Sequence, residues 1–184
     1  MAHATNLGIN ANAIVLAGDS AGAQIAAQLA NIISDPGYAE AVGIAPTVSL
    51  AQLRGVVLVS GAFDMSTVSL DGPYGWFIRT VLWSYSGVRD FLNDEQFTLA
   101  SVTRYVTPRF PPAFITSGNA DPLEPQAVAL AGRLHELGVR VEELFFSEAH
   151  PPLQHEYQFN LDDQAGMTAL DRTLAFLKAV VAST

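Results

Sequence analysis

Residues 13–22 read Ala-Ile-Val-Leu-Ala-Gly-Asp-Ser-Ala-Gly, and this stretch decides the fold that we predict for the chain. Its apolar run, 13–17, ends at a glycine, and the segment that follows is rich in Ala, Gln, Leu and Ile, as a helix would be. Further apolar runs occupy 56–60, 113–117 and 139–146. The first three runs are continuous rather than alternating, which is typical of strands buried on both faces of a parallel sheet.

Predicted helices separate these runs. Residues 21–33 are expected to stop near Pro36, and residues 123–137 to end at Gly138, a favourable residue after a helix. A terminal helix is expected to open at Asp162 or Asp163 and to carry an apolar stripe at three- and four-residue steps, formed by Met167, Leu170, Leu174, Leu177 and Val181. Strands that alternate with helices predict an α/β fold: a single domain over 1–184, with a parallel sheet of about four strands and helices on both faces.

Residues 64–112 interrupt this alternation between two predicted strands. The segment ends in the Pro-rich run 108–112 and contains both tryptophans and three of the five tyrosines: Trp76, Trp83, Tyr74, Tyr85 and Tyr105. An insertion of this length is expected to form a partial cap, as a lid or a small subdomain. Its aromatic side chains have two possible roles, because they either contact a substrate or pack into a core of the insertion itself.

The G-x-S-x-G pattern of Gly18, Asp19, Ser20, Ala21 and Gly22 is typical of a nucleophile elbow. In such an elbow a tight strand-to-helix turn lifts the serine hydroxyl clear of the sheet, and glycines are needed where the backbone crowds its neighbours. The helix N-terminus behind the serine favours developing negative charge. We therefore predict Ser20 as a nucleophile. A phosphate-binding turn is the competing interpretation, although no Gly-Lys-Ser/Thr and no G-x-G-x-x-G sequence follows the strand.

Asp121 is the predicted acid of a catalytic triad with Ser20. It comes shortly after the run 113–117, and the carboxyl ends of parallel strands are where active sites of α/β proteins form. Capping of the helix that follows is its alternative role, and Glu124 is the spare carboxylate. The order serine, acid, histidine along the chain is that of α/β hydrolases.

Four histidines compete for the role of the general base. His3 lies near the terminus and His135 inside a predicted helix, so neither suits the role. His150 and His155 both follow the last predicted strand; two prolines brace His150, whereas His155 heads the segment that leads to the terminal helix. We predict that His155 takes the serine proton and returns it to the leaving alcohol, while the aspartate holds the orientation and tautomer of the imidazole.

The composition excludes several classes of partner and chemistry. Of the 184 residues 49% are apolar and 15% are charged, which supplies ample material for a buried core. Acidic residues outnumber basic ones by 18 to 9 and no basic run occurs, so nucleic acid and anionic membranes are poor candidate partners. Cysteine is absent, which removes disulfides and thiolate chemistry. No signal-peptide pattern and no apolar run of about 20 residues occurs, so the expectation is a cytoplasmic protein without a membrane span.

Three motifs, in this order, resemble the hormone-sensitive-lipase-like carboxylesterases: Gly-Asp-Ser-Ala-Gly-Ala at 18–23, Asp-Pro-Leu at 121–123 and His-Glu-Tyr at 155–157. The resemblance covers essentially the whole chain, as the second half of the family's fold. It implies hydrolysis of short- to medium-chain acyl esters without a metal or other cofactor, with a small-molecule ester as the partner. It also implies that residues 64–112 correspond to part of the family's cap.

The resemblance further implies features that this sequence lacks. Members of the family carry a His-Gly-Gly-Gly-type oxyanion loop upstream of the serine, and nothing similar occurs here, so the N–H of Ala21 is the one oxyanion donor predicted. In the family's sheet the strand at 13–17 has a neighbour on each side, whereas one flank is expected to be open here. Such an edge invites pairing or aggregation. The chain is therefore expected to lack an N-terminal portion, or to pair with another copy or another chain.

The leading hypothesis is a serine carboxylesterase that acts through an acyl-enzyme on Ser20. The alternative is a catalytically impaired fragment or non-catalytic remnant that lacks the upstream oxyanion loop, and turnover separates these two. A nucleotide-binding α/β domain is a third hypothesis, which a nucleotide titration would test.

Overall fold

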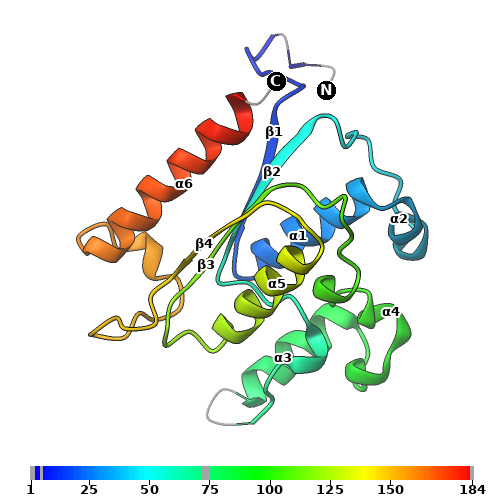
Figure 1. Cartoon of the computed structure of the whole chain (residues 1–184). Helices are drawn as coiled ribbons and strands as arrows, with labels where there is room; N and C mark the ends of the chain where they lie inside the picture. The colour runs from blue at the N-terminus through cyan, green and yellow to red at the C-terminus, as the bar shows by residue number, and fades with distance from the viewer. Residues whose placement is uncertain (1–2, 5, 72–74, 183–184) are drawn as a thin grey trace.

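The computed structural model describes residues 3–4, 6–71 and 75–182. All neighbouring strands of its four-stranded sheet are parallel, and their order in space follows the chain: β1 (Ile14–Asp19), β2 (Leu53–Val59), β3 (Ala113–Ser117) and β4 (Val141–Phe145). The predicted α/β fold with about four parallel strands is therefore confirmed (Figure 1). β2 begins earlier than predicted because its first residue, Leu53, pairs with Ile14 at the start of β1.

Helices and short 3₁₀ turns connect the strands. In chain order they are α1 (Ala21–Ser34), α2 (Pro36–Val42), η1 (Met65–Thr67), α3 (Gly75–Ser86), η2 (Phe91–Asn93), α4 (Glu95–Thr98), η3 (Val102–Arg104), α5 (Glu124–Glu136), η4 (Tyr157–Phe159) and α6 (Gln164–Ala182). α1 ends before Pro36, as predicted, but Pro36 itself opens α2, because a proline at the first helical position loses no hydrogen bond. α5 is followed by Gly138 in the left-handed conformation (φ 73°), and α6 begins directly after Asp163.

Both faces of the sheet are covered, as β2 illustrates. Val56 and Leu58 belong to a core with α1 and α5, whereas Val57 and Val59 belong to a second core with α6. The two cores alternate along the strand because successive side chains of a strand point to opposite faces. In Figure 1 α1 and α5 lie on one side of the sheet and α6 lies on the other. The predicted arrangement of helices on both faces is confirmed.

β1 differs from the prediction that it is buried on both faces. Its residues are half-buried and Ala17 is exposed, whereas every residue of β3 is buried. The reason is its position, because within the described residues β1 is an edge strand that pairs with β2 alone. The open flank that the sequence predicts is therefore present in the described part of the chain.

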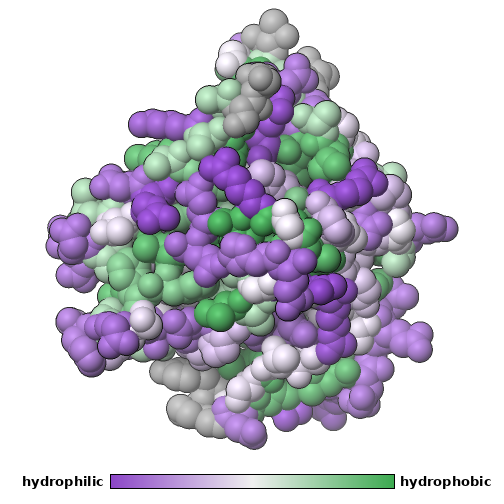
Figure 2. All heavy atoms as spheres, viewed as in Figure 1, coloured by the Kyte–Doolittle hydropathy of each residue, from purple (hydrophilic) through white to green (hydrophobic). Residues whose placement is uncertain are grey.

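The apolar stripe predicted for α6 is present on the helix, but most of it is exposed rather than packed on the sheet. Leu177 packs against the core, but the other four side chains of the stripe are exposed: Met167, Leu170, Leu174 and Val181. The buried face is formed instead by Ala169, Phe176 and Val180, and the ring of Phe176 lies 6.0 Å from that of Phe114 on β3. α6 has two apolar faces, and contact with the sheet selects the one that carries Phe176. Apolar surface is visible at the left of Figure 2, the side on which Figure 1 shows α6.

The insertion at 64–112 packs around a small core of its own, which is formed by Met65, Phe91, Phe97 and Ala100. Trp76, Trp83 and Tyr85 are exposed, and Tyr105 packs on Tyr38 of α2 with ring centroids 5.0 Å apart. Tyr74 lies outside the described residues. The own-core role thus applies to the buried phenylalanines, and the exposed Tyr85 contacts that core through the ring of Phe97, with centroids 6.3 Å apart. The role of the insertion as a cap, and the single-domain boundary, stay predictions.

Candidate active site

Ser20 sits on a sharp turn between β1 and α1. Its backbone has φ 54°, in the left-handed region, and its N–H donates to the carbonyl of Val59 at the end of β2 (2.9 Å). A Cβ added at Gly18 would lie 2.1 Å from the carbonyl oxygen of Gly22, so position 18 requires glycine. The same expectation for Gly22 is wrong, because a Cβ there would meet no neighbouring atom within 4 Å. It is the carbonyl of Gly22, not its α-carbon, that crowds the turn.

His155 lies between the two other predicted residues of the triad. Its Nε2 is 3.1 Å from Oγ of Ser20, and its Nδ1 is 2.9 Å from Oδ2 of Asp121. Ser20 and His155 are 135 positions apart in sequence. The fold brings them together because the strands are parallel, so the carboxyl ends of β1 and β4 lie at the same end of the sheet. The geometry is that of a nucleophile, a base and an orienting acid in hydrogen-bond contact.

Asp121 is held by more than the imidazole. Its side chain is fully buried; Oδ2 also accepts a hydrogen bond from Oγ of Ser117 (2.9 Å), and Oδ1 accepts one from the N–H of Leu123 (2.9 Å). In its alternative role, capping of the next helix, Asp121 is not the N-cap residue itself, because α5 begins at Glu124 with Leu123 as its N-cap; its Oδ1 and its carbonyl nevertheless accept the N–H groups of these two residues. The contact of Ser117 with Asp121 was not predicted from the sequence, although the place of Ser117 at the last position of a buried strand points to this edge of the sheet.

The loops that carry Asp121 and His155 are bonded to each other. Leu153 donates its N–H to Oδ1 of Asn119 (2.7 Å) and accepts the N–H of Ala120 (2.8 Å). A Cβ on Gly118 would lie 2.4 Å from the carbonyl oxygen of Leu153, so the close approach of the two loops depends on glycine at 118. These contacts fix the separation of acid and base.

The other histidines lie apart from this arrangement. His150 and His3 are exposed, and Nε2 of His135 pairs with Glu143 on β4. Glu124, the spare carboxylate, is the first residue of α5. The structure therefore brings His155 and not His150 to Ser20.

Asp19 and the residues after His155 form a second polar contact beside Ser20. Nε2 of Gln158 donates to Oδ1 of Asp19 (2.8 Å), and the carboxyl of Glu156 lies beside that of Asp19, where a proton on either one allows a hydrogen bond between them. Burial, with the hydrogen bond and the negative charge of Glu156, raises the pKa of Asp19 to about 6. Oε1 of Glu156 also lies 3.8 Å from Nε2 of His155. The sequence pattern of the elbow contains Asp19, but its partners could not be read from spacing.

Ala21 is the first residue of α1, so its N–H belongs to the helix N-terminal groups that have no acceptor within the helix. It lies next to Ser20 and is available to a developing oxyanion there. Among the described residues, no group of three or more His, Cys, Asp and Glu side chains is arranged to hold a metal ion. The described helices also include none that is long and apolar enough to cross a membrane. A cofactor-free reaction and a cytoplasmic location both stay predictions.

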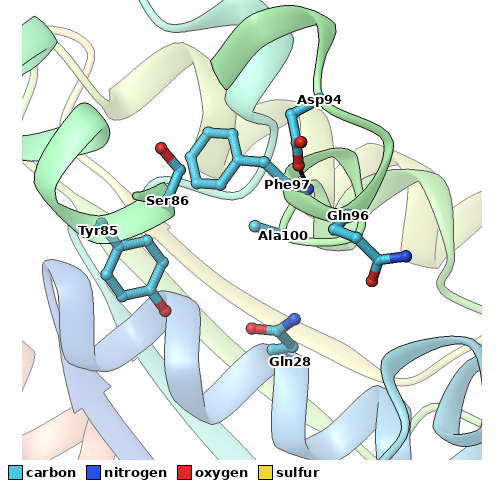
Figure 3. A pocket seen from close by; sticks show the side chains of 7 residues that line it. All are labelled: Gln28, Tyr85, Ser86, Asp94, Gln96, Phe97 and Ala100. Atoms are coloured by element: carbon cyan, nitrogen blue, oxygen red, sulfur yellow. Dashed lines mark hydrogen bonds between the residues drawn. The ribbon is translucent and has the colours of Figure 1, made fainter. Parts of the chain in front are cut away.

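A separate hollow of about 230 Å³ lies between α1 and the insertion (Figure 3). Gln28 of α1 faces Tyr85 and Phe97 across it, and Asp94 also lines it, where its side chain accepts the N–H of Phe97 (2.7 Å). Ser20, Asp121 and His155 do not line this hollow. It is therefore a feature of the contact between α1 and the insertion rather than of the candidate triad.

A parallel sheet with helices on both faces, and a serine on a strained strand-to-helix turn in contact with a histidine, define an α/β-hydrolase architecture. The chain belongs to the alpha/beta-hydrolase family, whose sequence pattern, described as alpha/beta hydrolase fold, matches residues 1–151. A search of the curated proteins gives no match.

Solved structures of esterases share the fold. Esterase B of Lactobacillus rhamnosis superposes with a TM-score of 0.74 at 20% identity, over 97% of this chain and 57% of that one. A fungal esterase of Rhizomucor miehei gives 0.67 at 21% identity (98% and 56%). The thermophilic carboxylesterase EstE1, cloned from a metagenomic library, gives 0.66 at 20% identity (98% and 59%). The chain thus spans less than two thirds of the length of these relatives, and its fold is of the esterase type.

Proposed function

We propose that this chain is the triad-bearing part of a serine carboxylesterase that hydrolyses short- to medium-chain acyl esters, with Ser20 as nucleophile, His155 as base and Asp121 as orienting acid. The observation that carries the proposal is the continuous hydrogen-bond chain from Oγ of Ser20 through the imidazole to a fully buried carboxylate. The esterase relatives support the reaction class at the level of the fold.

The reaction follows from the arrangement of these groups. Nε2 of His155 takes the hydroxyl proton as Oγ of Ser20 attacks the ester carbonyl, and Asp121 stabilises the imidazolium that results. Collapse of the tetrahedral intermediate breaks the bond to the alcohol oxygen, which leaves with the proton from Nε2. A water molecule then gives its proton to His155 and attacks the acyl-serine. Collapse of this second intermediate breaks the bond between the acyl carbon and Oγ of Ser20, which takes the proton back from His155 as the carboxylic acid leaves.

The oxyanion donors determine the expected rate. The N–H of Ala21 supplies one donor, and loss of a single donor from an oxyanion hole costs about 10²–10³ in kcat. Relatives that share this fold are longer than this chain, so further donors are expected from a part of the protein outside the 184 residues or from a second chain. We therefore expect slow turnover by the chain alone.

The test is hydrolysis of p-nitrophenyl butyrate and p-nitrophenyl laurate by the purified chain, with Ser20→Ala prepared identically. The proposal expects turnover of the butyrate above that of the variant, and a lower rate with the long-chain laurate. Labelling of Ser20 by a fluorophosphonate is measured in parallel, because it requires an activated serine but not completed turnover. If the wild-type chain neither hydrolyses the esters nor is labelled at Ser20, the esterase proposal fails and the chain is a non-catalytic remnant.

A further inference from the structure

The carboxyl of Asp19 joins two segments that lie far apart in sequence. Asp19 ends β1 and immediately precedes Ser20, whereas Glu156 and Gln158 belong to the segment that carries His155. Gln158 donates to Asp19 over 2.8 Å, and the carboxyl of Glu156 lies beside that of Asp19. His155 and Ser20 are therefore connected twice: directly by their own hydrogen bond, and indirectly by the contacts of Asp19, the neighbour of Ser20, with Glu156 and Gln158, which follow His155.

The backbone at Glu156 supports a functional reading of this contact. Glu156 has φ 63°, in the left-handed region that favours glycine, and non-glycine residues persist there only when their surroundings hold them in place. This conformation directs the segment from His155 into η4, where Tyr157 is buried and its hydroxyl contacts Oγ1 of Thr116 on β3. The segment after His155 is thus attached at two points: Tyr157 contacts β3, and Gln158 bonds to Asp19 beside Ser20.

Two adjacent carboxyls favour a proton on one of them, because two ionised carboxylates repel each other. The charged groups that face Asp19 are Glu156 and His155, and the neutral amide of Gln158 faces it as well. The raised pKa of Asp19 agrees with a shared proton. In its protonated form Asp19 donates to Glu156 and accepts from Gln158, so both bonds form at once.

We infer that Asp19 is a positioning residue, which holds Glu156 and Gln158 and thereby fixes the imidazole of His155 at hydrogen-bond distance from Ser20. The inference rests on the proposed function, since it assigns Asp19 a part in the same reaction. Asp19 acts through its neighbours and does not itself contact the reacting atoms. Misplacement of a catalytic group by about 1 Å costs roughly 10²-fold in rate.

Two substitutions of Asp19 separate positioning from charge. In Asp19→Asn the amide oxygen accepts from Gln158 and the amide N–H donates to Glu156, so both bonds persist. In Asp19→Ala both bonds are lost. We expect kcat for p-nitrophenyl butyrate to fall about 10²-fold in Asp19→Ala with KM nearly unchanged, and to stay within a few-fold of wild type in Asp19→Asn. Asp171→Asn, on the exposed surface of α6, is the matched control.

Gln158→Ala and the double variant Asp19→Ala/Gln158→Ala complete a cycle. If Asp19 acts through Gln158, the double variant is slowed little more than Asp19→Ala alone, whereas independent roles multiply the two losses. Melting temperatures of all variants identify any loss that comes from unfolding.

Proton NMR tests the same inference without turnover. The proton between Nδ1 of His155 and Asp121 is identified as the downfield resonance that is missing from His155→Gln. We expect it to be retained in Asp19→Asn and broadened or shifted in Asp19→Ala. If the wild type proves inactive but this resonance responds in that way, the esterase proposal fails and the positioning role stands. If Asp19→Ala matches the wild type in kcat and in this resonance, Asp19 is not a positioning residue.

Discussion

Replacement of Asp121 by asparagine tests the candidate triad at its most constrained member. The side chain is fully buried, and its two oxygens accept three hydrogen bonds: Oδ2 from Ser117 and His155, and Oδ1 from the N–H of Leu123. An amide has one oxygen, so asparagine cannot accept all three bonds. The structure thus leaves two orientations for the amide, and each has a different consequence.

With its oxygen toward Leu123, the amide turns its NH₂ to His155 and to Ser117, whose hydroxyl can rotate to accept. His155 must then present a lone pair at Nδ1 and carry its proton on Nε2, where it can no longer take the Ser20 proton. A tautomer error of this kind costs about 10⁴ in kcat. With the oxygen toward His155, the N–H of Leu123 loses its acceptor, at about 1–3 kcal/mol of unfolding free energy. We expect the first orientation, because it costs only the acceptor of the Ser117 hydroxyl proton, whereas the second costs the N–H of Leu123 its acceptor and also turns the amide NH₂ toward that N–H.

The assay is the initial rate of p-nitrophenyl butyrate hydrolysis at saturating substrate, with the melting temperature measured on the same preparations. Asp121→Asn is expected to lose about 10⁴ in kcat and to melt near the wild-type temperature. Glu124→Gln, the same chemical change in the spare carboxylate, is expected to keep its activity. An Asp121→Asn protein that retains more than about a tenth of wild-type kcat would refute the role of Asp121.

Three further predictions concern packing and pH. Gly18→Ala is expected to prevent folding to the native state, since its Cβ would lie 2.1 Å from a carbonyl oxygen, whereas Gly22→Ala, with no atom within 4 Å, should express and melt like wild type. Phe176→Ala is expected to lower the unfolding free energy by about 3–5 kcal/mol in urea titrations, and Leu174→Ala, on the exposed face, by far less; equal losses would contradict the packing of α6. The folded chain keeps a proton on Asp19 up to about pH 6, whereas the unfolded chain releases it near 3.8. The contribution of Asp19 to the unfolding free energy is therefore complete below pH 3.8 and lost as pH rises through 6. We expect the melting temperature of the wild type to fall relative to that of Asp19→Asn between pH 4 and 6. Parallel curves of melting temperature against pH for the two proteins would exclude the raised pKa.

Most of the sheet was predictable from the sequence because buried parallel strands leave a simple signal. The runs at 56–60 and 113–117 are apolar except for Ser60, Thr116 and Ser117 at their ends, and the structure has β2 and β3 at these places. The residues at the ends of strands were also predictable as candidates, because chain order and strand ends suffice to select Ser20 and Asp121. Their distances to His155 come only from the folded chain.

Other features depend on contacts that local patterns do not contain. The stripe that includes Leu174 has good helical spacing, yet α6 buries the face of Phe176, because the space beside Phe114 accepts an aromatic ring. The partners of Asp19 were not predictable either, since Glu156 and Gln158 are more than a hundred residues away. Such choices depend on the tertiary structure, and sequence periodicity does not determine them.

The strand order has a consequence for how folding of this chain can be followed. Neighbours in the sheet are also successive in the chain, so Ser20 lies beside the first strand and His155 comes after the last. The hydrogen bond between them closes a loop of 135 residues, which loses a large conformational entropy and forms only when β4 is docked. A partly folded molecule that lacks β4 therefore has an ordinary, unreactive serine. The fraction of molecules whose Ser20 reacts with a serine-directed reagent would then equal the fraction in which all four strands are assembled, so the serine serves as a built-in probe of the completed fold.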